Sequence, residues 1–218
     1  MHVFIIGITG GVGSLVAQDL LKRGDTVAGL VRRPEQRDEL AAAGMTGEVG
    51  DLTALSSTEL VPLIGQADCV VFTAGAAGSQ QATSALDGEG VVKAIEAAQL
   101  MPTPPRFVLV SVFPEAWRER NLGPDFDHYI HVKKTADIAL VRSELDWVIL
   151  RPSALQDEPG RGTVSLGPAE IHEEVPRADV AATLAALVHE PGISRQILEL
   201  TAGSTPINEA VIRNVPKR

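Results

Sequence analysis

The chain has 218 residues, of which 44% are hydrophobic and 22% charged, and its 28 acidic and 19 basic side chains give a formal net charge of −9. This is ordinary globular composition, and the acidic balance argues against a nucleic-acid binder, which needs a basic surface. No apolar stretch reaches the roughly 18–20 residues of a membrane span. Cys69 is the single cysteine, so no disulfide can form within the chain, which fits a reducing cytoplasm. We expect a cytoplasmic protein whose partner is a small molecule.

The first half of the chain alternates strand-like and helix-like segments. Short apolar runs predict strands at Val3–Ile6, Thr26–Val31, Thr46–Val49, Asp68–Thr73 and Phe107–Val110. Apolar residues at helical spacing predict helices at Val12–Lys22, Pro34–Ala43, from Ser56 or Ser57 to Ile64, and from Thr83 or Ser84 to Leu100. Because several strands are apolar on both faces, the pattern predicts an α/β fold with a doubly wound parallel sheet.

The alternation becomes less regular after the fifth predicted strand. Residues 113–127 are interpreted as a loop, and residues 151–176, with four prolines and three glycines, as irregular loop with short strands. The remaining predicted elements are helices at His128–Ser143, Arg177–His189 and Ile207–Arg213, and strands at Trp147–Leu150 and Gln196–Leu200. We expect a single domain over residues 1–218, with a small C-terminal lobe mainly in 151–218.

A glycine-rich turn follows the first predicted strand and opens the first helix. It reads Gly7-Ile8-Thr9-Gly10-Gly11-Val12-Gly13. In such a turn the first glycine lets the chain leave the strand sharply, the second lets backbone approach a diphosphate, and the third lets helix and strand pack closely. A P-loop would need a lysine at position 14, where Ser14 stands. The turn therefore predicts a dinucleotide site, with a plain tight turn as the alternative.

The residues after the next strands predict which dinucleotide binds. NAD-binding proteins carry a carboxylate at the end of the second strand, whereas this chain has Arg32 and Arg33 there. A guanidinium suits the 2′-phosphate of NADP, so NADP is favoured over NAD, unless both arginines are simply solvated. Asp51 and Leu52 are expected near the adenine. Ala74 and Gly75, after the fourth strand, are small enough for the ribose to approach.

Three polar residues form a candidate catalytic set. Tyr129 and Lys133 are four residues apart on a predicted helix and so share a face, and Ser111 ends the fifth strand, at the sheet edge where ligands bind. We expect Tyr129 to act as general acid with its pKa lowered by the Lys133 ammonium. Lys133 would also hold the nicotinamide ribose, and Ser111 the substrate oxygen. The alternative is an amphipathic helix with a buried tyrosine and a surface lysine.

These motifs resemble the atypical, NmrA-like branch of the short-chain dehydrogenase/reductase superfamily over nearly the whole chain. The resemblance rests on residues 7–13, 31–32, 50–52, 87–90, 107–111, 150–153, 157–160 and 175–181. It implies an NADP-binding Rossmann domain in which Arg32 contacts the 2′-phosphate and Pro152 and Ser153 lie near the nicotinamide. It also implies that Asp87 replaces the active-site asparagine of the larger superfamily.

The function that follows is an NADPH-dependent oxidoreductase that reduces a small carbonyl or quinone-like compound. Three alternatives stay open: an NADP-binding redox sensor without catalysis, a flavin- or biliverdin-type reductase, and a small epimerase or dehydratase. The 68 residues after position 150 disfavour the last, because they are few for the substrate lobe of a sugar-nucleotide epimerase. His128 and His131 lack the further ligands that a metal site needs. Trp117, Arg118 and Arg120 form either a substrate lid or an ordinary exposed loop.

Overall fold

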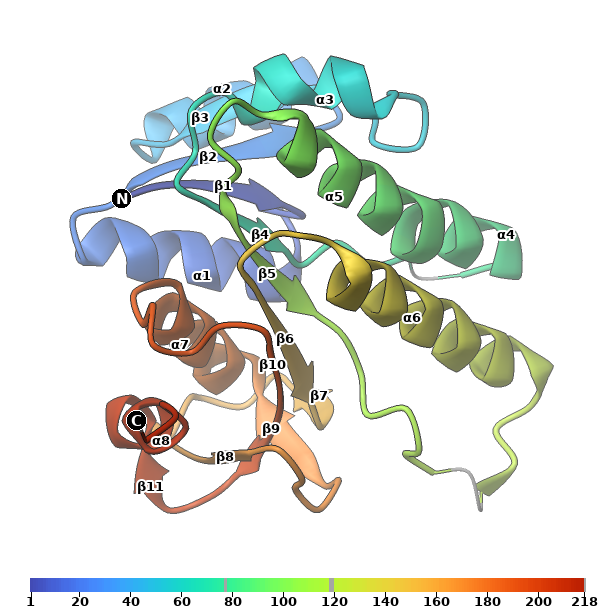
Figure 1. Ribbon diagram of the computed structural model, residues 1–218, viewed down its shortest axis with the longest axis vertical. Coiled ribbons are helices and arrows are strands. Elements are labelled where there is room, and N and C mark those ends of the chain that lie inside the picture. The colour runs from blue at the N-terminus through green and yellow to red at the C-terminus, as the bar shows by residue number, and fades with distance from the viewer. Residues whose placement is uncertain (77, 118–119, 218) are drawn as a thin grey trace.

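Alternate residues of the first strand, β1 (His2–Ile6), enter two different hydrophobic cores. Val3 and Ile5 pack into one core, and Phe4 and Ile6 into the other. Because successive side chains of a strand point to opposite faces, such a strand must be covered by helices on both sides. The computed structural model, which describes residues 1–76, 78–117 and 120–217, has this three-layer arrangement (Figure 1).

The central sheet has the strand order β11-β8-β10-β6-β5-β4-β1-β2-β3. Its parallel part, besides β1, consists of β2 (Thr26–Val31), β3 (Thr46–Val49), β4 (Cys69–Phe72), β5 (Arg106–Val110), β6 (Trp147–Pro152) and β10 (Gln196–Ala202). The direction of strand addition reverses between β1 and β4. Ligands of such sheets bind outside the carboxyl ends of the strands at this reversal. The predicted doubly wound sheet is confirmed.

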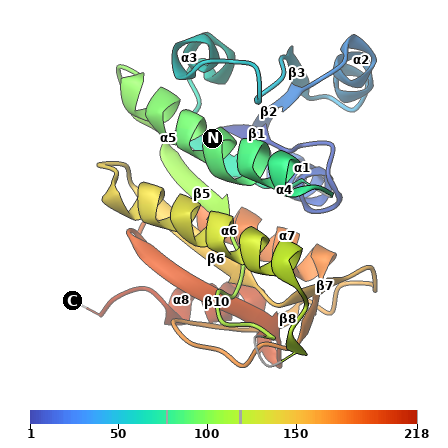
Figure 2. The ribbon, with the colours of Figure 1, turned by 90° about the vertical axis from the view of Figure 1, so that its right-hand side faces the viewer.

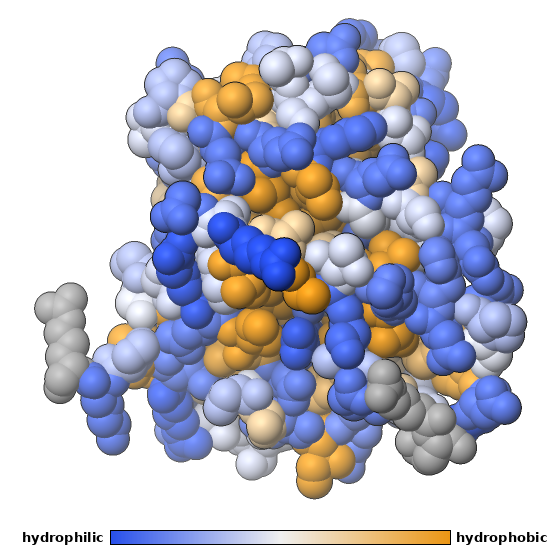
Figure 3. Space-filling model, turned by 45° about the vertical axis from the view of Figure 1, so that its right-hand side comes forward, coloured by the Kyte–Doolittle hydropathy of each residue, from blue (hydrophilic) through white to orange (hydrophobic). Residues whose placement is uncertain are grey.

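The two faces of the sheet carry different helices. One face is covered by α1 (Gly11–Lys22), α2 (Pro34–Ala42), α7 (Arg177–Val188) and α8 (Ile207–Arg213). The other is covered by α3 (Ser57–Ile64), α5 (Val91–Leu100) and α6 (Pro124–Arg142). Figure 2 shows α5 and α6 side by side along this second face. Apolar patches on the face seen in Figure 3 are separated by hydrophilic side chains.

The carboxyl ends of the parallel strands form the edge where the dinucleotide is expected, called the cofactor edge below. Two predicted helices differ from the structure at this edge. The helix expected over residues 83–100 begins earlier, as α4 (Gln80–Thr83), and continues into α5 through a π-helical stretch, η1 (Ser84–Gly90). The loop expected to extend to Asp127 ends at Gly123, because α6 begins at Pro124. Gly123, the residue before the helix, has φ +92°, which is not a helical conformation, so the helix cannot begin earlier. Pro124 at the first helical position has its φ already fixed near the helical value.

The C-terminal residues build onto one edge of the sheet. After β6, β8 (Thr163–Gly167) pairs antiparallel with β10, and β11 (Thr205–Pro206) pairs with β8. Two further strands, β7 (Ala154–Gln156) and β9 (Glu174–Pro176), form a separate parallel pair. The short strands expected within residues 151–176 are therefore present, as β7, β8 and β9. Among the described residues, no helix is long and apolar enough to cross a membrane.

Candidate active site

The glycine-rich turn connects the end of β1 to α1 by close backbone contacts. Gly7 has φ +97°, and a Cβ there would lie 2.5 Å from the amide nitrogen of Ala74. A Cβ on Gly13 would lie 2.1 Å from the carbonyl oxygen of Gly7. Gly10 is less crowded, with its nearest neighbour at 3.1 Å, and it is exposed together with Thr9. Gly7 and Gly13 therefore bring the backbone together, and Gly10 faces the open side.

The N-terminus of α1 presents its backbone donors without competition from side chains. Gly10 is the N-cap residue and gives no side-chain cap, and the first turn contains no acidic residue. The free N–H groups and the positive end of the helix dipole are then available to an anionic ligand. This cradle fits the diphosphate of a dinucleotide, with Gly11 and Val12 at its base.

The two arginines after β2 are exposed, and their backbone is fixed. The amides of Arg32 and Arg33 both donate to Gln36 Oε1, at 3.2 and 3.1 Å. The neighbouring carboxylate of Asp51 accepts hydrogen bonds from the hydroxyl and amide of Thr53, at 2.8 and 2.9 Å. These bonds and, to a smaller degree, the charge of Arg32 lower the pKa of Asp51. Arg32 and Asp51 thus lie at the same edge of the sheet.

The side chain of Leu52 belongs to the core. It is 4% exposed, and a Cβ on Gly90 would lie 2.9 Å from it. Its carbonyl oxygen accepts a hydrogen bond from Lys93 Nζ at 3.4 Å. The contact of Leu52 with the adenine stays a prediction.

Asp87 positions the loop after β4. It lies in the π-helical stretch, is 1% exposed, and accepts a hydrogen bond from the amide of Ala76 at 2.9 Å. A Cβ on Gly75 would lie 3.3 Å from Asp87 Oδ1, so the loop passes close to this carboxylate. π-Helical turns often occur at functional sites. Here the turn fixes the segment that contains Ala74 and Gly75.

Lys133 is buried between this carboxylate and a strand end. Its Nζ donates to the carbonyl oxygen of Val110 at 2.9 Å and lies 3.6 Å from Asp87 Oδ1. The residue is 4% exposed, so the alternative of a surface lysine is wrong. Burial lowers the pKa of Lys133, while the charges of Asp87 and Asp137 act in the opposite direction.

The pKa of Tyr129 is displaced in the direction opposite to the one expected. Burial, reinforced by the negative charge of Asp87, raises it to about 12. The expectation that the Lys133 ammonium lowers this pKa is therefore wrong, because burial dominates the shift and the negative charge of Asp87, beside that ammonium, adds to it. Tyr129 remains a neutral hydroxyl at ordinary pH, which suits a proton donor.

A second buried carboxylate, not anticipated from the sequence, lies next to Ser111. Asp137 is 4% exposed and pairs with Arg151 at 2.8 Å. Burial raises the pKa of Asp137, and the neighbouring Ser111 hydroxyl and Arg151 oppose this effect. Among the described residues the Ser111 Oγ makes no hydrogen bond of ordinary geometry. The spacing of Tyr129, Lys133 and Asp137 at four-residue intervals was the available signal.

One cavity of about 300 Å³ brings most of these residues together. Its lining includes nine of the residues predicted for catalysis or cofactor binding: Val12, Ala74, Gly75, Asp87, Ser111, Tyr129, Lys133, Pro152 and Ser153. Arg32, Arg33 and Asp51 lie elsewhere on the cofactor edge, after β2 and β3. The lining thus joins the strand ends on both sides of the reversal to the inward face of α6.

Aromatic side chains form the outer wall of this cavity. The His172 ring, which the sequence analysis did not select, makes edge contacts with Phe113 and Trp117, at ring-centroid distances of 5.0 and 4.7 Å. Trp117 lines the cavity and the guanidinium carbon of Arg120 lies 4.8 Å from its ring centre, whereas Arg118 lies outside the described residues.

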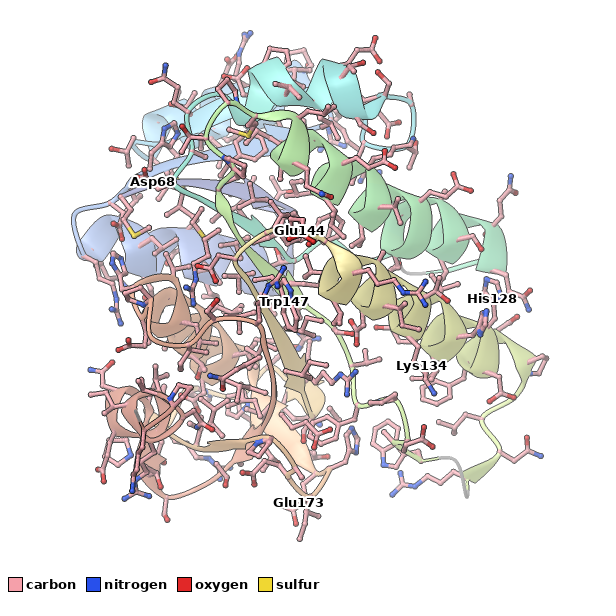
Figure 4. The ribbon with its side chains drawn as sticks, in the orientation of Figure 1. Asp68, His128, Lys134, Glu144, Trp147 and Glu173 are labelled. Atoms are coloured by element: carbon pink, nitrogen blue, oxygen red, sulfur yellow. The ribbon has the colours of Figure 1, made fainter. Side chains whose placement is uncertain are left out.

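The histidines on either side of the tyrosine face another groove. His128 and His131 line it with residues of η1 and α5, and His128 Nε2 lies 2.9 Å from Ser84 Oγ. Figure 4 shows His128 between the ends of α4 and α6. Within the described part of the chain, no cluster of three or more His, Cys, Asp or Glu side chains is arranged to hold a metal ion.

Comparison with known proteins identifies the family. A family model described as NAD(P)H-binding matches residues 7–191, which include the glycine-rich turn and the whole cavity. The chain belongs to this NAD(P)H-binding family. The resemblance to atypical short-chain dehydrogenase/reductases is thereby confirmed.

Full-length relatives agree with this assignment. The chain is 35% identical over 214 residues to the uncharacterized sugar epimerase YhfK of Bacillus subtilis, covering 97% of this chain and 99% of the relative. It resembles the solved structure of a putative NAD-dependent epimerase/dehydratase from Bacillus halodurans, with TM-score 0.88, 30% identity and coverage of 98% and 99%. The anaerobilin reductase ChuY of Escherichia coli O157:H7 shares the fold, with TM-score 0.78, 24% identity and coverage of 94% and 98%.

Proposed function

We propose that the protein is an NADPH-dependent oxidoreductase that reduces a carbonyl or quinone-like compound. The observation that carries the proposal is that Ser111, Tyr129 and Lys133 line one cavity together with Pro152 and Ser153. A proton donor and a hydrogen-bond donor then face the place where the resemblance puts the nicotinamide. A pure redox sensor has no need of such a pair.

NADP is the proposed form of the cofactor. Arg32 is exposed at the end of β2, where a 2′-phosphate would lie, and no carboxylate follows directly to accept the ribose hydroxyls of NAD. The cofactor would supply a hydride to the substrate. The diphosphate would bind at the N-terminus of α1, over Gly10 and Gly11.

The protein's own residues would donate the proton and orient the substrate oxygen. The Tyr129 hydroxyl, with its pKa raised to about 12, stays protonated and delivers its proton to the oxygen of the substrate. The Ser111 hydroxyl, which lies beside Asp137 and lines the cavity, donates a hydrogen bond to the same oxygen and orients it. Lys133 is fixed by Val110 and Asp87 and offers its remaining proton toward the nicotinamide ribose. Solvent then restores the proton of Tyr129.

The cavity wall favours a planar, conjugated substrate within this class. The chain has five Phe, two Trp and one Tyr. Four of these aromatic residues lie in the core beneath α3, α5 and α6, namely Phe4, Phe72, Phe107 and Trp147. The other four all line the cavity, namely Phe113, Trp117, Phe126 and Tyr129. Aromatic rings gain most from flat, polarizable partners, so a quinone-like acceptor suits the wall better than a small aldehyde.

The test is NADPH oxidation with a panel of quinones, ketones and aldehydes, using wild type and Tyr129→Phe. General acid catalysis contributes typically about 10²–10⁴-fold, so the variant should lose that factor in kcat while its dissociation constant for NADPH stays unchanged. Phe126→Leu, in the same wall, is the matched control for loss of aromatic surface. NADPH binding without oxidation of any substrate would contradict the proposal and favour the sensor.

A second candidate is a reductase of flavins or linear tetrapyrroles that relies on direct hydride transfer. The same aromatic wall supports it, and ChuY, which shares the fold, is an anaerobilin reductase. Such an enzyme would turn over flavin or bilin at an undiminished rate in Tyr129→Phe. Epimerisation of a nucleotide sugar without net NADPH consumption would instead favour the activity in the name of YhfK.

A further inference from the structure

An arginine from the C-terminal half of the chain lies against the start of α1. Helices α1 and α7 pack side by side on one face of the sheet (Figure 1). Arg177 is the first residue of α7, and a Cβ on Gly11 would lie 3.2 Å from its Cδ and 3.4 Å from its Nε. The guanidinium is therefore next to the first residue of the helix whose N-terminus faces the cofactor edge.

The Arg177 guanidinium is held there by a weak ion pair with an exposed carboxylate. Arg177 Nη1 donates to Asp157 Oδ1 at 2.6 Å, and the Asp157 side chain is 89% exposed. Exposed ion pairs of this kind stabilise a protein only slightly, because water screens them. The Arg177 side chain itself is 29% exposed. It is thus partly ordered by its packing on Gly11 and free to exchange its carboxylate for a stronger anion.

The dinucleotide diphosphate is such an anion. The protein carries a net charge of −9, and the diphosphate adds two further negative charges. The first turn of α1 offers backbone donors but no basic side chain. A guanidinium can donate two parallel hydrogen bonds to phosphate oxygens, which makes arginine well suited to this position.

We infer that Arg177 binds the diphosphate of the cofactor, leaving Asp157 to do so. Asp157, between β7 and β8, then acts as a competing acceptor that holds the guanidinium beside the site before the cofactor arrives. The inference rests on the NAD(P)H binding of the family and not on the acid–base chemistry proposed for Tyr129. It assigns a cofactor contact to a residue 164 positions beyond the glycine-rich turn.

The test is the dissociation constant for NADPH, measured by quenching of protein fluorescence, in three variants. A lost charge-assisted pair of hydrogen bonds corresponds to a weakening of about 10–100-fold in Arg177→Ala. Asp157→Asn removes the competitor and should tighten binding by about 2–5-fold. Arg161→Ala is the matched control, since Arg161 lies in the same region and pairs with exposed Glu158 at 3.4 Å. It should leave the dissociation constant within about twofold of wild type.

Two probes separate a diphosphate contact from general damage. ADP-ribose, which contains the diphosphate, should lose affinity in Arg177→Ala, whereas adenosine 2′-monophosphate, which lacks it, should not. Arg177→Lys keeps the charge and should recover part of the affinity. Unchanged NADPH binding in a folded Arg177→Ala would overturn the inference and leave the cofactor assignment intact. Failure of wild type to bind either NADPH or NADH would overturn both.

Discussion

The two halves of the cofactor edge differ in the groups that form them: backbone in one half and buried side chains in the other. Around β1 and β4, the edge consists of backbone and small residues. Gly7 and Gly13 lie so close to neighbouring backbone that neither position has room for a side chain. Around β5 and β6, it consists of long buried side chains from α6, with Lys133 and Asp137 facing inward. The first half offers a shape that many dinucleotides fit. The second half specifies a chemistry.

This difference determines how each half tolerates change. A glycine contact is lost when atoms are added, because added atoms collide with backbone that cannot move. A buried charge pair is lost when atoms are removed, because the remaining partner is left without compensation. Replacements in the two halves should therefore fail for opposite reasons and to different degrees.

The largest effect is expected from Asp137→Ala, in the side-chain half. The Arg151 side chain is only 16% exposed and would lose the carboxylate that accepts its two hydrogen bonds, at 2.8 and 3.1 Å. Breaking a buried pair in this way costs about 3–5 kcal/mol of unfolding free energy. Urea denaturation measures it. Asp137→Asn keeps an acceptor but removes the charge, so it should lose part of the same free energy. A loss well under about 3 kcal/mol in Asp137→Ala would show that the carboxylate is not what stabilises Arg151.

A slightly smaller effect is expected from Gly13→Val, in the backbone half. Its Cβ would lie 2.1 Å from the carbonyl oxygen of Gly7, so α1 must move off the sheet. Overpacking of this kind costs about 3 kcal/mol, which corresponds to a fall in melting temperature of about 6–12 °C. Gly10→Ala is the matched control: its Cβ meets only Gly7 O, at 3.1 Å, so it should fold normally and weaken cofactor binding alone. A stable Gly13→Val would remove the packing argument.

The sequence was most informative where backbone constraints leave few solutions. Gly7, Gly10 and Gly13 could be assigned their positions because strand-to-helix turns of this tightness exclude side chains. The alternation of apolar strands and amphipathic helices predicted the sheet, because each strand must be covered on both faces. The start of α6 was placed four residues late, because Gly123 and Pro124 read equally well as part of a loop.

The side-chain half was harder to foresee, because its contacts join distant segments. Burial, reinforced by the charge of Asp87 from a distant segment, reverses the expected pKa shift of Tyr129, and no local pattern reveals it. The contact of Arg177 with Gly11 and the contact of His172 with Phe113 also span the chain. Spacing on one helix could have indicated Asp137, but its partner Arg151 comes from β6.

Beyond the glycine-rich turn, one exposed side chain after β2 is expected to select between NADP and NAD. Arg32→Asp should weaken NADPH binding by about 10–100-fold, because a charge-assisted pair with the 2′-phosphate is lost, and should leave NADH binding unchanged or improved. Titration with both nucleotides measures the preference. Arg37→Asp is the control, since Arg37 lies on α2 and pairs with its neighbour Asp38 at 3.2 Å. An unaltered ratio of the two affinities in Arg32→Asp would remove the assignment of NADP.

The smallest effect is a spectroscopic one, and it tests the charge balance in the side-chain half. Tyr129 is the single tyrosine of the chain, so the ultraviolet absorbance of tyrosinate reports on it alone. With the pKa raised to about 12, the native protein should show little tyrosinate at about pH 10.5, where the unfolded chain, with an ordinary pKa of about 10, is mostly ionised.

The change of the Tyr129 titration midpoint in Asp87→Asn separates the two causes of that shift. Burial is the larger cause and the negative charge of Asp87 the smaller. Asp87→Asn removes the charge and leaves Lys133 without its carboxylate, so both changes favour the tyrosinate and the midpoint should fall. It should stay above that of the unfolded chain, because the hydroxyl remains buried. Asp51→Asn, on the opposite half of the edge, should leave the midpoint unchanged. A wild-type midpoint at or below about 10 would mean that the Lys133 ammonium dominates after all, and the proton donor would then titrate with its ordinary sensitivity to pH.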